Sequence, residues 1–249
     1  TREPIGVIGI ITPWNFPIAI PTWKMAPAIA YGNTVVIKPA ELVPGSTWAI
    51  VDIMVRAGLP KGVVNLVMGK GSVVGQTMLE SKDVHAISFT GSVGTGKRVA
   101  TASIEVGRKF QLEMGGKNPT IVLDDADLKV AVESVAQSAF FSTGQRCTAS
   151  SRVIVTEGIH DKFVAAVEAK MQQLVVGHPA REGVHIGAVA DSRQLEQNLN
   201  ACHQAHDSPA GLPADVADTF ERVSTHITQT ADLFPYWRSY SADHPHRES

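Results

Sequence analysis

Short runs of consecutive apolar residues, rich in Val and Ile, alternate with longer segments of helical periodicity from residue 4 to residue 156. Apolar residues on consecutive positions, rather than on every second one, are typical of strands buried on both faces of a parallel sheet. This pattern predicts six strands, at Ile5–Ile11, Asn33–Ile37, Val63–Val67, Ala86–Phe89, Thr120–Leu123 and Val153–Val155.

Helical patterns lie between several of these runs. The clearest are at Thr47–Ala57, Val73–Ser81 and Leu128–Phe141. Ser46 is a candidate N-cap for the first of these helices, and the turn Gly58-Leu59-Pro60 predicts where it ends. Repeated strand–helix units of this kind predict an α/β protein with a doubly wound parallel sheet.

The periodicity changes after the last predicted strand. A helix is predicted over Asp161–Val176, with one apolar face that packs into a core. That face consists of Phe163, Val164, Val167, Met171 and Leu174. Residues 201–249 contain one of the 21 glycines but five of the nine histidines, and residues 200–249 are predicted to form a poorly ordered tail. His203 and His206 lack a further pair of ligands, so no metal site is predicted there.

Composition narrows the class of protein. With 249 residues, 44% hydrophobic and 18% charged, the chain is typical of a globular protein. A net charge of −2 gives no basic surface for nucleic acid or an anionic membrane, and no apolar stretch approaches the roughly 20 residues of a membrane span. Two cysteines cannot build a disulfide framework. The start lacks both an initiating Met and a signal peptide, so we expect part of a longer, cytoplasmic enzyme.

Two segments carry residues suited to covalent catalysis. Cys147 follows Gly144-Gln145-Arg146, a polar setting that favours a reactive thiol over a buried, inert one. Glu113 stands between an apolar run and paired glycines, which predicts a carboxylate at the carboxyl end of a strand. Burial there would raise its pKa toward the range of a general base, whereas the alternative is a solvated glutamate at a turn.

Two further segments follow predicted strands. Asn15 stands between Pro13 and Pro17, which fix the direction of its amide as an oxyanion site requires; a turn-forming asparagine is the alternative. Lys38 and Glu41 come directly after a predicted buried strand. A cation and a carboxylate at that place suit the hydroxyl groups of a ribose, and an exposed ion pair is the alternative.

A glycine-rich turn runs from Phe89 to Lys97 and suits a phosphate at the N-terminus of a helix. It matches the pattern Gly-x-x-x-x-Gly-Lys, but Arg98 stands where a P-loop has the Ser or Thr that binds Mg²⁺. A P-loop nucleotide hydrolase is therefore disfavoured, and the turn by itself indicates only compatibility with phosphate.

In their order and spacing, these five segments closely resemble the aldehyde dehydrogenase superfamily of NAD(P)-dependent enzymes, from about residue 2 to residue 199. The resemblance implies that Cys147 is the nucleophile, which forms a thiohemiacetal and then a thioester. It also implies that the Asn15 side chain and the backbone N–H of Cys147 hold the oxyanion. Glu113 would activate the water that hydrolyses the thioester.

The resemblance further implies a site for NAD or NADP, and no metal. The residues that it assigns to the cofactor are Ile11, Thr12, Pro13, Trp14, Lys38, Glu41, Gly91, Ser92 and Gly96. Lys24 falls at a matching position of the same cleft. The implied architecture is a Rossmann-like NAD(P)-binding domain over residues 1–114, incomplete at its start, and an incomplete catalytic domain over residues 115–199.

Semialdehyde dehydrogenases are the members that this sequence resembles most. Enzymes for 2-oxoglutarate semialdehyde (2,5-dioxopentanoate) come first and those for succinate semialdehyde second, and full-length members form homo-oligomers. The later family segments, including a Glu-x-Phe-Gly-Pro motif, do not follow residue 199. Two alternatives stay open: a truncated module that binds nucleotide without turnover, and a thiol-dependent esterase that uses Cys147, Asn15 and Glu113.

Overall fold

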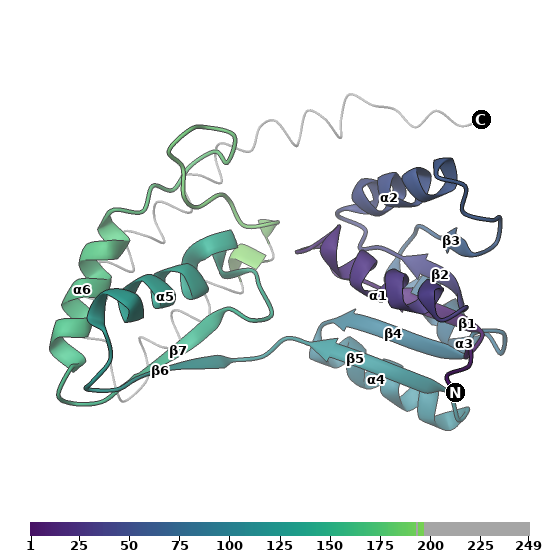
Figure 1. The fold of residues 1–249 in the computed structure, drawn as a ribbon, viewed down its shortest axis with the longest axis horizontal. Coiled ribbons are helices and arrows are strands. Elements are labelled where there is room, and N and C mark those ends of the chain that lie inside the picture. Colours follow the sequence, from purple (N-terminus) through teal and green to yellow (C-terminus); the bar gives the residue numbers. More distant parts are fainter. Residues whose placement is uncertain (193, 197–249) are drawn as a thin grey trace. The chain divides into compact units, whose positions relative to one another are not determined.

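The computed structural model describes residues 1–192 and 194–196 and divides into two compact units (Figure 1). The first unit is Thr1–Gly116, and the second begins at Lys117. The boundary between the two domains was expected between residues 114 and 115. The predicted tail from residue 200, with His203 and His206, lies outside the described residues. The two units are considered separately.

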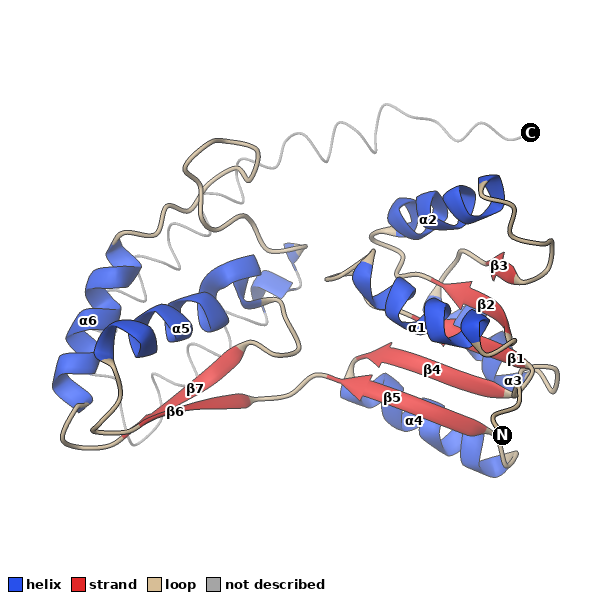
Figure 2. Cartoon of the chain, in the orientation of Figure 1, coloured by secondary structure: helices blue, strands red, loops and turns tan. Residues whose placement is uncertain are grey.

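A five-stranded parallel sheet forms the centre of the first unit (Figure 2). Its strands are β1 (Val7–Ile11), β2 (Thr34–Lys38), β3 (Val64–Leu66), β4 (Ala86–Gly91) and β5 (Lys109–Met114). They stand in the order β3-β2-β1-β4-β5, and every neighbouring pair is parallel. The predicted doubly wound α/β sheet is confirmed, with the reversal of strand order between β1 and β4.

Helices cover both faces of this sheet. They are α1 (Ala19–Ala30), α2 (Pro44–Arg56), the π-helical turn η1 (Gly71–Gly75), α3 (Gln76–Glu80) and α4 (Val93–Glu105). On one face Met25 of α1 belongs to a core with Ile10 and Ile37, and on the other Val99 of α4 belongs to a core with Ile87. The central strands therefore supply apolar side chains to two cores, which explains their consecutive apolar residues.

The ends of α2 show one prediction wrong and one confirmed. The helix begins at Pro44 with Val43 as N-cap, so Ser46 lies inside it and is not the cap. Proline suits the first helical position because its φ is already helical and its missing N–H needs no acceptor. Ala57 is the C-cap and Gly58 follows with φ +95°, so the helix ends at the predicted glycine turn.

The apolar pattern does not predict α1 or α4. Pro21 and Pro27 both lie within α1. Pro21 stands in the first turn, where the backbone N–H groups have no partner within the helix. At Pro27 the tertiary core compensates for the hydrogen bond that an internal proline removes. Gly94 and Gly96 in the first turns of α4 interrupt its apolar periodicity, so no helix is predicted there. The edge strand β5 has no fully buried side chain, so it leaves only a weak signal in the sequence.

The second unit contains a parallel pair of strands and two helices. Its elements are β6 (Asn118–Val122), α5 (Leu128–Phe140), the 3₁₀ turn η2 (Phe141–Gly144), β7 (Ser150–Val155) and α6 (His160–Gln172). Phe163 of α6 is buried with Val122 and Val135, and Val167 packs against them. The predicted stripe on α6 is wrong at Val164, which is 39% exposed because it lies about 100° around the helix from Phe163.

The end of α6 differs from the prediction too. The helix stops at Gln172, so Leu174 and Val176 lie beyond it. Within residues 1–192 and 194–196, no helix is both long and apolar enough to cross a membrane. The same residues contain no cluster of three or more His, Cys, Asp or Glu side chains that could hold a metal ion.

Candidate functional site

The carboxyl end of β2 brings Lys38 and Glu41 together. Lys38 is only 4% exposed, and its Nζ donates to the Pro39 carbonyl oxygen at 2.9 Å and lies 3.9 Å from Glu41 Oε1. The same Oε1 accepts a hydrogen bond from the backbone N–H of Gly71 at 2.6 Å. Burial lowers the pKa of Lys38, and the Glu41 carboxylate opposes this shift. The pair is therefore a buried cation beside a half-exposed carboxylate, and not the exposed ion pair of the alternative reading.

The segment after β1 runs beside the end of β2. The backbone N–H of Thr12 donates to the Lys38 carbonyl oxygen at 3.2 Å. The Thr12 side chain is buried, and its Oγ1 has no hydrogen-bond partner among the described residues. A buried hydroxyl without a partner is uncommon, and it marks a place where a bound molecule can supply one. The partly buried residues around it are Ile11, Pro13, Trp14 and Asn15.

The turn between β4 and α4 has the features of an anion site. Gly91 ends β4, and Ser92 caps α4: its Oγ accepts from the Thr95 backbone N–H at 3.3 Å and donates to Thr95 Oγ1 at 2.9 Å. The first turn of α4 contains no acidic side chain. A Cβ on Gly96 would overlap Met114 Sδ, whereas a Cβ on Gly94 would meet nothing within 4 Å. Glycine at 96 thus lets α4 lie close to β5. Close packing of a helix and a strand at a glycine is also a feature of turns that bind phosphate.

Replacing Gly96 by Ala is expected to cost about 1 kcal/mol more than replacing Gly94 by Ala, because only the former places a methyl group against the Met114 side chain, which must shift to make room. Both changes gain about the same helix propensity, so the difference between them isolates the steric cost. Chemical denaturation of the two variants measures this difference. Equal free energies of unfolding would contradict the close approach of α4 to β5.

Glu113 takes part in a polar network on three elements of the first unit. Gln111 Nε2 donates to Glu113 Oε1 at 2.8 Å, and Gln111 Oε1 accepts from Ser88 Oγ at 2.7 Å and from Lys24 Nζ at 2.9 Å. Lys24 Nζ also donates to Ser88 Oγ at 2.8 Å. The expected burial of Glu113 is wrong, because its side chain is exposed near the end of an edge strand.

The ammonium of Lys24 is the perturbed group of this network. Burial lowers the pKa of Lys24 from 10.5 to about 8, and the negative charge of Glu113 acts in the opposite direction. Lys24 is therefore partly neutral near pH 8: its neutral amine can accept a proton, and its ammonium form can donate one. The hydrogen bonds through Gln111 link it to the Glu113 carboxylate.

Acylation of Lys24 by an amine-reactive reagent is expected to rise with a midpoint near pH 8 in the folded protein. In urea the midpoint is expected to return toward the ordinary lysine value, because the desolvation is lost. Glu113→Gln removes the opposing charge and is expected to shift the folded midpoint to still lower pH. Peptide mapping by mass spectrometry follows the reaction, and a folded midpoint equal to that in urea would contradict the desolvation of Lys24.

Cys147 lies in an exposed turn between η2 and β7, and its thiol is free. Asn118, at the start of β6, donates from Nδ2 to the carbonyl oxygen of Cys147 at 2.7 Å and to that of Ala149 at 3.2 Å. The burial of Cys147 in the alternative interpretation is therefore wrong. The turn presents the thiol to solvent, while the side chain of Asn118 holds its backbone.

The neighbouring Arg146 has a structural role at the end of α5. Its guanidinium donates to the carbonyl oxygens of Gln137 and Ser138, the latter at 3.3 Å. These carbonyl groups lie in the last turn of the helix, where the helix has no further N–H donors for its final carbonyls and where positive charge is stabilising. Arg146 thus anchors the segment before Cys147 to α5.

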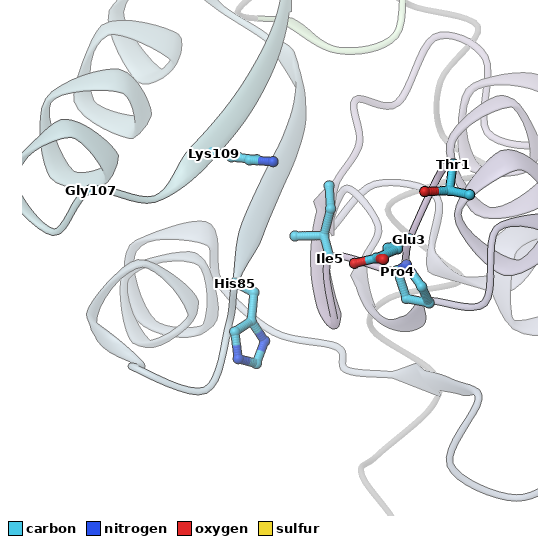
Figure 3. Close-up of a pocket in the computed structure, with 7 residues that line it drawn as sticks. All are labelled: Thr1, Glu3, Pro4, Ile5, His85, Gly107 and Lys109. Carbon is cyan, nitrogen blue, oxygen red and sulfur yellow. The ribbon is translucent and has the colours of Figure 1, made fainter.

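The cavity in Figure 3 lies elsewhere, at the amino ends of the first unit's strands. It is lined in part by Ile5 before β1, His85 before β4 and Lys109 at the start of β5. Ligands of open α/β sheets bind at the carboxyl ends of the strands. This cavity, which is largely open to solvent, is therefore not the candidate site.

The first unit brings together Lys38 with Glu41, and Lys24 with Glu113, while Cys147 belongs to the second unit. Sequence reasoning does not identify Ser88 or Gln111 as members of the Glu113 network. The available signal is the spacing of Gln111 and Glu113, which share one face of β5 because side chains alternate along a strand.

Comparison with known proteins relates the chain to one family. The model of the aldehyde dehydrogenase family matches residues 1–226, so the match extends past residue 199, where the resemblance was expected to end. The alpha-ketoglutaric semialdehyde dehydrogenase of Bacillus subtilis is 50% identical over 212 residues, which cover 85% of this chain and 43% of that protein. The 2,5-dioxopentanoate dehydrogenase of Saccharolobus solfataricus is 45% identical, over 80% of this chain and 42% of that protein.

Solved structures agree with this relation. PnpE in complex with nicotinamide adenine dinucleotide is 42% identical with a TM-score of 0.78, over 80% of this chain and 41% of that one. A betaine aldehyde dehydrogenase from Staphylococcus aureus in complex with NAD⁺ is 37% identical with a TM-score of 0.80, over 82% of this chain and 40% of that one. The chain spans less than half the length of each of these relatives. Because the family model matches residues 1–226 of the 249 in this chain, the chain belongs to the aldehyde dehydrogenase family.

Proposed function

We propose that this chain contributes the cofactor-binding and nucleophile-bearing parts of an NAD(P)-dependent enzyme that oxidises a semialdehyde to a carboxylic acid. The observation that carries the proposal is the exposed, free thiol of Cys147 in a turn held by Asn118. The preferred substrate is 2-oxoglutarate semialdehyde, with succinate semialdehyde second. The relatives named for 2-oxoglutarate semialdehyde and 2,5-dioxopentanoate, which are the same compound, support this order.

Cys147, Asn15 and Glu113 are assigned the chemical steps. The Cys147 thiolate adds to the aldehyde carbon, and the negative charge that develops on oxygen is held by the Asn15 amide and the backbone N–H of Cys147. Loss of hydride from the resulting thiohemiacetal leaves a thioester on Cys147. Glu113 then takes a proton from water, whose oxygen attacks the thioester carbon, and the carboxylic acid leaves as the thiol is restored.

The first unit contains side chains that fit a dinucleotide. Ser92 and the first turn of α4 suit the pyrophosphate, and Lys38 with Glu41 suits the adenosine ribose. The buried Thr12 hydroxyl, which has no partner among the described residues, supplies a further polar contact. When bound, NAD or NADP accepts the hydride that leaves the aldehyde carbon. Ile11, Pro13, Trp14, Gly91 and Gly96 are the remaining residues assigned to this site.

Two broader expectations belong to the same proposal. A cytoplasmic location suits an enzyme whose nucleophile is an exposed free thiol, because reducing compartments preserve thiols. The complete protein is also expected to form homo-oligomers, as the resemblance implies.

Absorbance of reduced nicotinamide tests the proposal. The purified chain is mixed with NAD or NADP and with 2-oxoglutarate semialdehyde or succinate semialdehyde. A steady increase is expected that Cys147→Ala abolishes and that the matched control Cys202→Ser leaves intact. Folded protein that binds the cofactor without any increase would contradict turnover by this chain and support the nucleotide-binding module. Cleavage of an aryl ester without cofactor would support the esterase alternative.

A further inference from the structure

The backbone before Cys147 has an unusual conformation. Ser142, Thr143 and Gly144 are three consecutive residues in the left-handed helical region, with φ values of 55°, 57° and 65°. Residues other than glycine visit this region singly and at a cost of about 1–2 kcal/mol each, and for a β-branched residue such as Thr143 it is a true outlier. Such a turn persists only where surrounding contacts hold it.

Two side chains bind one short segment of the chain: that of Thr143 within this turn, and that of Gln145 directly after it. Thr143 Oγ1 donates to the Gly187 carbonyl oxygen at 3.1 Å. Gln145 Oε1 accepts a hydrogen bond from the backbone N–H of Ala190 at 2.8 Å. We call residues 186–190 the strap. It lies more than forty positions further along the chain, so these contacts are tertiary rather than local.

The strap is fixed at its other end to the segment that follows α6. The Gly177 backbone N–H donates to the Ile186 carbonyl oxygen at 3.0 Å, and the Ile186 N–H donates to the Val175 carbonyl oxygen at 3.1 Å. His185 Nδ1 accepts from the Val175 backbone N–H at 3.0 Å. A strap with an anchored base can therefore hold the left-handed turn in a single place.

Cys147 follows this turn closely, and its own carbonyl group is held by a second contact. Gln145 precedes it by two residues, and Asn118 Nδ2 binds its carbonyl oxygen. The strap contacts thus restrain the chain on the amino side of Cys147, and Asn118 restrains the residue itself. None of these contacts involves the sulfur, so they act on its position rather than on its chemistry.

We propose that Thr143 and Gln145 are positioning residues, which bind the strap and so fix the place of the Cys147 side chain. This inference rests on the proposed function, because it concerns Cys147 as the nucleophile. A nucleophile must be held in a narrow range of positions to attack a carbonyl carbon efficiently. The energy stored in the left-handed turn is compensated by the strap, and releasing the strap lets the turn relax and the thiol move.

A nitroxide spin label on Cys147, in a Cys202→Ser background, reports this mobility directly. Gln145→Ala and Thr143→Val are each expected to shorten the rotational correlation time of the label by about two-fold or more, because nanosecond loop motion becomes available. Thr143→Ser keeps the hydroxyl and is expected to retain the parent spectrum. Gln172→Ala, at an exposed glutamine that ends α6, is the matched control and is expected to retain it too.

Unchanged label mobility in both Gln145→Ala and Thr143→Val would overturn the proposal. Should these variants fail to fold, hydrogen exchange of the unsubstituted protein decides: the Ala190 amide is expected to be protected at least about ten-fold, and exchange at the rate of a free amide would overturn the proposal. Neither readout needs turnover. An ordered label in a chain that produces no reduced nicotinamide therefore removes the proposed function and leaves the positioning contacts in place.

Discussion

Glu113→Gln is expected to lower steady-state oxidation of the semialdehyde by about 10²–10⁴-fold, the usual contribution of a general base. Glutamine has nearly the same shape, and its side-chain oxygen can still accept the hydrogen bond from Gln111 Nε2. It cannot take a proton from water, however. Addition of the thiol and loss of hydride still proceed, so the acyl group is expected to remain on Cys147 as a thioester.

Intact-protein mass spectrometry after mixing with aldehyde and cofactor detects this thioester. Absorbance of reduced nicotinamide is expected to stop after about one equivalent per chain, in place of a steady increase. Glu105→Gln, at an exposed glutamate that ends α4, is the matched control and is expected to turn over like the parent. Turnover of Glu113→Gln within a few-fold of the parent would remove Glu113 from the hydrolytic step.

Arg108→Ala is expected to destabilise the first unit by about 3 kcal/mol, the cost of removing one partner from a buried, charged hydrogen-bond group. Arg108 follows α4 and precedes β5 in the sequence, and its side chain is buried. Its guanidinium donates to the carbonyl oxygens of Leu79 at 2.8 Å and Ser81 at 2.6 Å. A longer bond reaches the Met78 carbonyl oxygen. Burial lowers the pKa of Arg108, and the loss of its side chain leaves the end of α3 without these donors.

Tryptophan fluorescence in urea measures this change, because Trp14, Trp23 and Trp48 all lie in the first unit. The parent and both variants carry the substitution Trp237→Phe, so that the signal comes from the first unit alone. Arg56→Ala is the control: that arginine pairs with Asp52 on the surface of α2, and its loss is expected to cost at most about 0.5 kcal/mol. Similar costs for the two substitutions would show that Arg108 does not secure α3.

The sheet of the first unit is predictable because its central strands are buried on both faces. Val35 and Ile37 are fully buried in one core while Ile87 is fully buried in the other, so neighbouring strands all appear as dense apolar runs. The helices α1 and α4 are not predictable from the same signal, and of the edge strand β5 only its carboxyl end at Glu113 is predicted. Their prolines, glycines and exposed positions satisfy tertiary packing rather than local periodicity.

The residues of the candidate site likewise fall into those that the sequence predicts and those that it does not. Cys147, Glu113 and Lys38 can be singled out because motif and position coincide within short segments. The network of Lys24, Ser88 and Gln111 cannot, because its members come from α1, β4 and β5 and meet only after the sheet has formed. The left-handed turn at 142–144 is likewise hidden, since Ser and Thr carry no preference for that conformation.

The division between Gly116 and Lys117 also bears on how such a chain can change over time. Residues proposed to select the dinucleotide, such as Glu41 and Ser92, belong to one compact unit, and those that hold the nucleophile, such as Asn118, belong to the other. Each unit has its own core. A substitution that changes the proposed cofactor preference can therefore be accepted without a cavity in the core that supports Cys147, and a change near Cys147 can be accepted without one in the core of the sheet.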